Sequence, residues 1–301
     1  MTYTKEQIIE YSKPISDTEK EQCINAINMV KDALKAYGFV ITTELKNYDE
    51  DGYAYYYEFR DSLYSTITAI IQGSYGNNTN IKRYSDVDIS IVKTSRIPLS
   101  LEETFYKYKK KIYNALSNYF STGVKYKNKS IRVEGNTYRK SIDVVPAYSL
   151  TLNLENGIEF LTDDGDRIVN YPLLQIKNEN AKNKATNYYF KKYVRIFKNI
   201  KKDMEDSYIS SAKKVGSFQL ESLIWNVPNT TITKSANLAY GVYEIINYLI
   251  ENRLSIKYYK ESNGIKRLCL DDEKYINIIN YLNDIKSFYK YEWGEENGRN
   301  Y

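Results

Sequence analysis

The chain has 301 residues, 42% hydrophobic and 15% aromatic, which is enough apolar surface to bury one large core or two smaller ones. Its 43 basic and 38 acidic residues give a net charge of +5, which suits polyanionic ligands and an ordinary solvated surface equally well. Two cysteines, Cys23 and Cys269, with no histidine exclude a disulfide framework and argue against structural zinc. Any chemistry therefore depends on carboxylates, lysines, hydroxyl groups or a bound metal.

The first residues, MTYTKEQIIEYSKP, contain no apolar signal-peptide core. No window approaches the roughly 18 consecutive apolar residues of a membrane span. We therefore expect a soluble, cytoplasmic protein that contacts no membrane.

The N-terminal half predicts one long helix followed by strands. Ser16 and Glu19 have capping-box spacing and precede apolar residues at helical intervals, so we expect a helix over about 16–37. The segment 99–120 is also typical of a helix, whereas the tyrosine-rich, acidic stretch 39–62 has weak periodicity and receives no assignment. Four segments alternate β-branched and polar residues and predict strands of one sheet: 65–72, 86–92, 130–134 and 139–148.

The C-terminal half changes from strand to helix patterns after Pro172. Two short apolar runs flank Asp-Asp-Gly-Asp within 156–172 and predict a β-hairpin. Helical periodicity follows over 182–203, 216–225, 234–254 and 272–290. We therefore expect an α+β protein with a sheet lobe over 1–177, a helical lobe over 178–301, and a ligand site in the cleft between them.

Two acidic residues, Asp86 and Asp88, stand one residue apart within a predicted strand. Residues i and i+2 of a strand point to the same side, so these carboxylates lie together while Val87 and Ile89 face the other way. A divalent cation between the carboxylates would relieve their repulsion, and hard oxygen ligands suit Mg²⁺. Asp143, in a second apolar strand, would complete a two-metal site.

An isolated Asp-x-Asp pattern more often marks a solvated sheet face, and Asp143 alone could form a local salt bridge. The preceding stretch changes this interpretation. Gly73 and Ser74 follow a predicted strand and precede a polar turn, where exposed backbone N–H groups bind anions. A phosphate-binding turn beside a Mg²⁺ site is what nucleotidyl transfer requires.

The order Gly-Ser-x-x-x-x-Thr, then Ser-Asp-Val-Asp-Ile, then a distant Ile-Asp-Val-Val-Pro resembles the DNA polymerase beta-like nucleotidyltransferase superfamily. Within it, the chain is most similar to the bacterial CD-NTases, the cyclic-oligonucleotide synthases related to DncV and cyclic GMP-AMP synthase. The likeness continues through NYPLLQIKNENAKNKAT and GSFQLESLIWNVPN and covers most of 16–230. The tyrosine-rich segment near 45–60 and the residues after about 230 match nothing in the pattern.

This resemblance implies a polymerase beta-like sheet lobe with a helical C-terminal lobe. It implies that Asp86, Asp88 and Asp143 are catalytic and bind two Mg²⁺ ions, or Mn²⁺ in their place. A 3′-hydroxyl would attack the α-phosphate of ATP, UTP or GTP without a template, releasing pyrophosphate and giving a cyclic di- or oligonucleotide. In the family such a product activates a separate effector in anti-phage (CBASS) signalling.

The same resemblance gives roles to residues of the helical lobe. Lys191, Arg195 and Lys198 form a basic stripe at helical spacing, and a stripe that faces the cleft would hold triphosphate. Lys198 and Ser217 correspond to the triphosphate-contacting Lys and Ser of the family, although a solvated lysine is an equal alternative for Lys198. Phe218 would stack on a nucleobase or else belong to the core.

Asn178 aligns with a nucleobase-facing position of the synthases. In one branch of the family an Asn there accompanies uridine-containing products, and a carboxamide pairs with the O4 and N3–H edge of uracil. We therefore expect at least one pyrimidine base in the product. The alternative is that Asn178 caps the following helix.

Two other functions share the same motifs. A nucleotidyltransferase that tails RNA or modifies a small molecule such as an antibiotic would use the same three aspartates. A catalytically dead nucleotide-binding module would be expected to lack one of them, and all three are present. The stretches KNKAT and SFQLESLIWNVPN favour the cyclic-oligonucleotide synthase.

Overall fold

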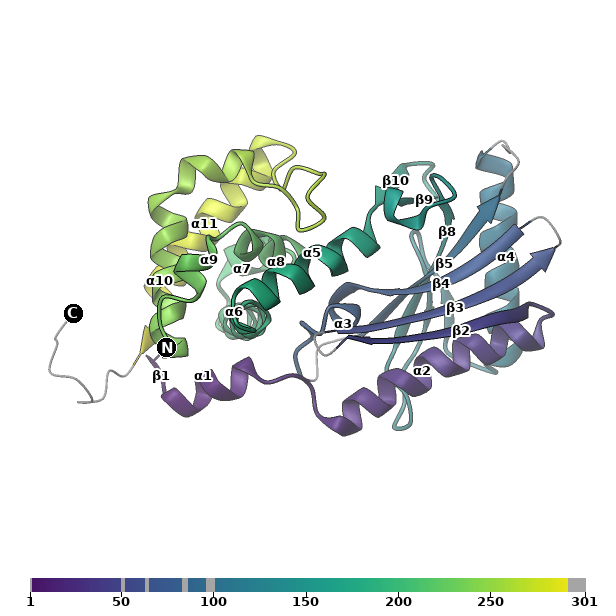
Figure 1. The fold of residues 1–301 in the computed structure, drawn as a ribbon, viewed down its shortest axis with the longest axis horizontal. Coiled ribbons are helices and arrows are strands. Elements are labelled where there is room, and N and C mark those ends of the chain that lie inside the picture. The colour runs from purple at the N-terminus through teal and green to yellow at the C-terminus, as the bar shows by residue number, and fades with distance from the viewer. Residues whose placement is uncertain (1, 50–51, 63–64, 83–85, 96–100, 292–301) are drawn as a thin grey trace, which may run out of the picture. The chain divides into compact units, whose positions relative to one another are not determined.

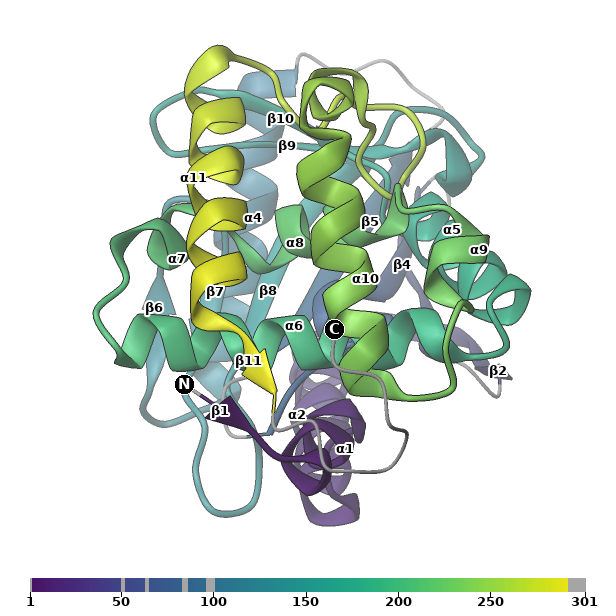
Figure 2. The ribbon, with the colours of Figure 1, turned by 90° about the vertical axis from the view of Figure 1, so that its left-hand side faces the viewer.

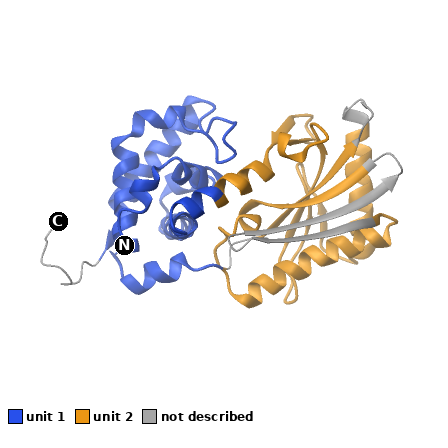
Figure 3. Ribbon diagram, viewed as in Figure 1, with its two compact units in different colours: residues 1–14, 181–301 blue, residues 15–180 orange. Residues whose placement is uncertain are grey.

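The computed structural model describes residues 2–49, 52–62, 65–82, 86–95 and 101–291. The chain divides into two compact units, a sheet unit of residues 15–180 and a helical unit of residues 1–14 and 181–301 (Figure 3). The predicted division at 177/178 falls close to this boundary, but it assigned the first 14 residues to the sheet lobe. They belong to the helical unit because Tyr3 and Ile8 are buried in that unit's core.

The sheet unit is built on a mixed sheet of nine strands, counted over the part of the chain that the structure describes. The strands are β2 (Val40–Asp49), β3 (Gly52–Ser62), β4 (Ser65–Gln72), β5 (Val87–Ser95), β6 (Val124–Tyr126), β7 (Ile131–Val133), β8 (Ile142–Ser149), β9 (Ile158–Leu161) and β10 (Arg167–Asn170). Their order is β10-β9-β8-β5-β4-β3-β2, with β7 also on β8 and β6 on β7. The β5–β8 pair is parallel and the other pairs are antiparallel.

The four predicted strands are confirmed as β4, β5, β7 and β8, and the predicted hairpin is confirmed as β9–β10. The unassigned tyrosine-rich stretch forms the hairpin β2–β3, which extends the sheet beyond β4. Pro146 sits inside β8 without breaking it. On one side of β8, Val144 is the last residue paired with β7 and Tyr148 is the first residue paired with β9. Pro146 lies between these two residues, so the N–H that proline lacks falls in a gap between two partner strands.

Two long helices, α2 (Asp17–Ala36) and α4 (Leu101–Tyr119), pack against each other and against the sheet (Figure 1). The predicted cap of α2 is present, since the Ser16 side chain accepts a hydrogen bond from the Glu19 backbone N–H at 3.2 Å. The shorter elements of this unit are α3 (Gly73–Gly76) and η1 (Leu154–Asn156). Helix α5 (Pro172–Ala185) contains the boundary between the units.

The helical unit comprises β1 (Thr2–Tyr3), α1 (Lys5–Ser12), α6 (Tyr189–Asp206), α7 (Ser210–Lys214), α8 (Ser217–Trp225), α9 (Asn229–Ile232), α10 (Leu238–Glu251), η2 (Arg253–Tyr258), α11 (Asp272–Phe288) and β11 (Lys290–Tyr291). Figure 2 shows α10 beside α11 and β1 beside β11, a parallel pair that joins the two ends of the described chain. The predicted helices 216–225, 234–254 and 272–290 are confirmed as α8, α10 and α11. None of the described helices is both long enough and apolar enough to cross a membrane.

Candidate active site

Three acidic residues lie on one face of the sheet where β5 and β8 run side by side. Asp88 of β5 is directly opposite Asp143 of β8 in the parallel register. Asp86 precedes Asp88 by two residues and therefore points to the same face. Val87 between them faces the core and is fully buried, and its N–H donates to the Ser141 carbonyl at 3.0 Å, which fixes this alignment.

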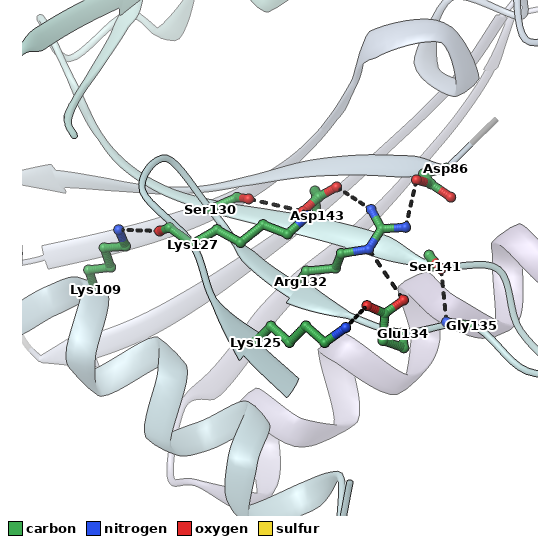
Figure 4. Close-up of polar contacts among 10 residues, drawn as sticks. All are labelled: Asp86, Lys109, Lys125, Lys127, Ser130, Arg132, Glu134, Gly135, Ser141 and Asp143. Atoms are coloured by element: carbon green, nitrogen blue, oxygen red, sulfur yellow. Dashed lines mark hydrogen bonds and ion pairs between the residues drawn. The ribbon is translucent and has the colours of Figure 1, made fainter. Parts of the chain in front are cut away.

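The guanidinium of Arg132 lies between two of these acids (Figure 4). Its Nη2 is 2.9 Å from Asp86 Oδ2, its Nη1 is 2.8 Å from Asp143 Oδ2, and its Nε is 3.4 Å from Glu134 Oε2. Arg132 reaches this face because it is directly opposite Asp143 in the antiparallel β7–β8 pair. Burial lowers the pKa of Arg132, but the neighbouring carboxylates outweigh it and hold the pKa above its ordinary value.

The second oxygen of Asp143 is held by the loop between β6 and β7. Its Oδ1 accepts a hydrogen bond from Ser130 Oγ at 2.9 Å and lies 3.7 Å from Lys127 Nζ. The fully buried Lys109 anchors this loop by donating at 2.8 Å to two of its carbonyls, one of them that of Lys127, and at 2.7 Å to Asp163 Oδ1 (Figure 4). The orientation of Asp143 thus depends on residues of three elements.

The predicted phosphate-binding turn lies directly against Asp88. Gly73 has a φ of +66°, and a Cβ added there would lie 3.2 Å from Asp88 Cγ and closer still to a carboxylate oxygen. The backbone N–H of the buried Thr79 donates to the Ser74 carbonyl at 2.9 Å and closes the turn. Glycine is therefore required at position 73 by both its backbone conformation and the space available.

Among the residues that the structure describes, no three His, Cys, Asp or Glu side chains form a ready-made metal cluster. The guanidinium of Arg132 instead bridges Asp86 and Asp143, so a positively charged group lies between these two carboxylates. Carboxylate oxygens are the ligands that Mg²⁺ prefers in proteins. The donor chemistry of the three acids therefore fits a hard divalent cation.

The predicted basic stripe of α6 lies inside the helical unit. Lys191, Arg195 and Lys198 are 2%, 6% and 5% exposed. Arg195 Nε donates to the Ser12 carbonyl at 2.7 Å, and Lys198 forms an ion pair with Glu221 of α8. The interpretation of Lys198 as a solvated lysine is therefore wrong, and Arg195 holds the N-terminal segment.

Ser217 and Phe218 begin α8 and are both exposed, Phe218 to 37%. The alternative that Phe218 belongs to the core is therefore wrong. Ser217 is four residues before Glu221, so the two lie on one face of α8, the face whose Glu221 pairs with Lys198. This face of α8 brings the two predicted triphosphate contacts, Ser217 and Lys198, to the same region of the helical unit.

Asn178 lies in the middle of α5. The alternative that it caps the following helix is wrong, because α5 continues to Ala185 and the residue preceding α6 is Tyr188. One turn further along α5, Lys182 Nζ donates to the Val227 carbonyl. Burial lowers the pKa of Lys182 to about 8.

Several contributors were not apparent from the sequence, among them Arg132, Ser130 and Glu221. Arg132 has a partial signal, because it alternates with the fully buried Ile131 and Val133 and so must face away from the core. Nothing in the sequence indicates that β7 pairs with β8 in the register that brings Arg132 to Asp143.

Comparisons with known proteins show the family to which the chain belongs. Residues 177–300 match the family model of the cGAS/DncV-like nucleotidyltransferase C-terminal helical domain. The chain is 34% identical to the cyclic GMP-AMP synthase CdnE03 of Staphylococcus schleiferi, over 97% of this chain and 98% of that protein. It is 32% identical to the cyclic dipyrimidine nucleotide synthase CdnE of Cecembia lonarensis, over 88% of this chain and 90% of that protein.

A solved structure has the same fold. The Elizabethkingia meningoseptica CdnE cyclic dinucleotide synthase, determined with GTP and Apcpp, matches with a TM-score of 0.77 and 28% identity, covering 95% of this chain and 99% of that chain. The expected α+β fold, a sheet lobe with a helical C-terminal lobe, is confirmed. With 34% identity over nearly its whole length to one synthase and a matching C-terminal family model, the chain belongs to the bacterial CD-NTases and is a nucleotidyltransferase.

Proposed function

We propose that this enzyme joins nucleoside triphosphates, without a template, into a cyclic di- or oligonucleotide second messenger. The observation that carries the proposal is the parallel register of β5 and β8, which sets Asp88 opposite Asp143 with Asp86 on the same face. The synthases named above, similar over 88% or more of this chain, support the cyclic product. The structure of a related synthase with GTP and a second nucleotide analogue supports nucleoside triphosphates as substrates.

In this proposal Asp86, Asp88 and Asp143 hold two Mg²⁺ ions, or Mn²⁺ ions, which supply the positive charge that acidifies the attacking hydroxyl and neutralises the triphosphate. The carboxylates orient the 3′-hydroxyl of one nucleotide in line with the α-phosphate of the next, and one of them accepts the hydroxyl proton. The new bond from oxygen to α-phosphorus forms as the bond to pyrophosphate breaks. A second attack of the same kind within the linear intermediate closes the ring and releases a second pyrophosphate.

We assign nucleotide contacts to six further residues. The Gly73–Ser74 turn would bind phosphate through its backbone N–H groups, and Lys198 and Ser217 would contact the triphosphate. Phe218 is exposed enough to stack on a base. Asn178 would read a base edge. The cyclic product would act on a separate effector in anti-phage signalling in the cytoplasm.

The test is to incubate the purified protein with all four labelled nucleoside triphosphates, Mg²⁺ and no acceptor. Small, phosphatase-resistant products that mass spectrometry identifies as cyclic support the proposal. Product formation only after RNA or an antibiotic is added would identify an RNA-tailing or small-molecule nucleotidyltransferase. Nucleotide binding by calorimetry without turnover in Mg²⁺ or Mn²⁺ would identify an inactive binding module.

Base choice is tested in the same assay with Asn178→Ser. The relatives do not decide it, because a cyclic GMP-AMP synthase and a cyclic dipyrimidine synthase are 34% and 32% identical to this chain. We expect wild-type product with at least one uracil. We expect Asn178→Ser to shift incorporation toward purines, since one base contact discriminates by about 1–3 kcal/mol, while the total rate stays within roughly tenfold of wild type. A wild-type product containing only adenine and guanine would refute the assignment.

A further inference from the structure

We propose that Arg132 is a positioning residue that holds Asp86 and Asp143 in place of the divalent cation, and that cation binding displaces its guanidinium from these two acids. The inference rests on the proposed function, because it concerns the metal ions that the three aspartates would bind.

The guanidinium of Arg132 contacts both Asp86 and Asp143. One terminal nitrogen of Arg132 lies 2.9 Å from Asp86 and the other lies 2.8 Å from Asp143, so a single planar group bridges both acids. The side chains of Arg132 and Asp143 are only 18% and 19% exposed, so their attraction is screened less than that of a surface pair. The guanidinium therefore fixes the separation of the two carboxylates.

The negative charges of Asp86 and Asp143 need one positive partner between them. Without a cation or Arg132, Asp86 and Asp143 would be like charges facing one another across neighbouring strands, an unfavourable arrangement. With both a cation and the guanidinium between them, the two positive groups would repel one another. Arg132 and a divalent cation therefore compete for the same carboxylate oxygens.

The neighbouring acid Glu134 gives Arg132 a third carboxylate partner. Its Oε2 lies 3.4 Å from Arg132 Nε, and its Oε1 is held by Lys125 at 2.8 Å (Figure 4). When Asp86 and Asp143 bind a cation, Arg132 retains this third carboxylate as a partner. The guanidinium is thus not left without a counter-charge after displacement, which would be costly for a partly buried charge.

The experiment measures Mn²⁺ binding to the full-length protein without nucleotide, by electron paramagnetic resonance. Arg132→Gln keeps most of the side-chain length and removes the charge. We expect it to lower the dissociation constant for Mn²⁺ roughly tenfold or more, because a competing positive charge at ion-pair distance is removed. Arg132→Lys, which keeps the charge but not the planar fork, should give an intermediate affinity.

A matched control is Arg167→Gln. Arg167 belongs to the same sheet and also forms an ion pair, with Glu159, and the β8–β9 register sets Glu159 opposite Tyr148, not beside Asp86 or Asp88. Its Mn²⁺ affinity should equal that of wild type. Unchanged or weaker Mn²⁺ binding by Arg132→Gln, or no Mn²⁺ binding by either it or the wild type, would overturn the proposal.

Asp88→Asn separates this inference from the proposed function. If Mn²⁺ binding survives Asp88→Asn undiminished, the aspartate metal site itself is wrong. If Asp88→Asn weakens binding strongly while Arg132→Gln changes nothing, the metal site stands and only the role of Arg132 is wrong.

If Arg132→Gln does not fold, a measurement on the wild-type protein tests whether the cation displaces the Arg132 guanidinium. In a nitrogen–proton correlation spectrum, the Nε–Hε signal of Arg132 is identified by its absence from Arg132→Lys. Saturating Mg²⁺ should shift this signal, because the guanidinium loses two carboxylate partners. A signal that does not move on saturation would overturn the displacement.

Discussion

Asp86 and Asp88 share one face of the sheet but differ in their surroundings. Asp86 has a side chain 44% exposed and bound to Arg132, whereas Asp88 lies against Gly73. We expect the double substitution of both by Asn to lower product formation at least about 100-fold, the scale seen when a preorganised electrostatic group is lost, because an amide supplies no charge to bind Mg²⁺. Pyrophosphate release measures the rate, and circular dichroism confirms that the fold is retained. A near-normal rate with the same product would contradict the metal assignment.

Gly73 offers a second test at the residue scale. Gly73→Ala should weaken activity by more than tenfold, because the new Cβ meets the Asp88 carboxylate, and should cost about 1–2 kcal/mol of stability for an L-residue in the left-handed region. The matched control is Gly165→Ala. Gly165 also has positive φ, at +91°, but an added Cβ there meets nothing within 4 Å. Equal activity losses in the two variants would mean that backbone strain alone explains the effect.

The sequence groups the candidate site residues but does not indicate the side chains that contact them. Asp86, Asp88 and Gly73 lie within 16 consecutive residues, so local spacing is enough to group them. The partners of Asp143 and Lys198 could not be predicted, because they depend on long-range pairing. Arg132 reaches Asp143 only through the β7–β8 register, and Lys198 meets Glu221 only through the packing of α8 on α6.

At the scale of elements, periodicity predicted the strands next to the site but not the hairpin β2–β3 (Val40–Asp49 and Gly52–Ser62). The run GYAYYYEF gives no clean alternation, because tyrosine is both apolar and polar and fits either face of a strand.

The segment 182–203, predicted as a single helix, contains the break between α5 and α6. Asn187 and Tyr188 adopt positive φ without a Gly or Pro to signal the break. The break is stabilised by the buried Thr186, whose Oγ1 accepts from the Phe190 N–H at 3.2 Å.

Lys182 of α5 makes the stability of the protein depend on pH. Burial lowers the pKa of Lys182 from its ordinary value of 10.5 to about 8, so the native state releases this proton at lower pH than the unfolded chain does. The unfolded chain then holds more protons between about pH 8 and pH 10.5, and stability rises with pH in that window. Urea denaturation of wild type and Lys182→Met should therefore show a stability difference that shifts in favour of wild type as pH rises through about 8. A difference independent of pH would contradict this assignment.

At the scale of the whole molecule, the chain has two separate hydrophobic cores, and each core stabilises its own unit. The sheet unit and the helical unit each bury their own apolar cluster. A boundary near residue 177 could be predicted because strand patterns end and helix patterns begin there. The membership of the first 14 residues could not, because it depends on contacts with residues about 200 positions away.

Deletion of residues 2–12 tests this division. Tyr3 and Ile8 are fully buried in the helical unit, and burial of such side chains is worth about 1.5–3 kcal/mol each. Tyr3 and Tyr11 also donate to the Asp203 carboxylate at 3.0 and 2.7 Å, and burial raises the pKa of Asp203. The deletion leaves this half-buried acid without two donors, so we expect the helical unit to unfold at a lower temperature than in wild type.

Hydrogen exchange locates the effect of the deletion. Exchange should quicken in α6 and α11 of the helical unit and stay at wild-type rates in β4, β5 and β8 of the sheet unit. Tyr3→Phe is the milder control, because it keeps the ring stacked on Tyr289 at 5.4 Å and removes only the hydrogen bond to Asp203. Its effect should be about 1 kcal/mol, confined to the same helices. If the deletion instead quickens exchange in the sheet strands as much as in the helices, the first 14 residues stabilise the sheet unit, as the division at 177/178 implied.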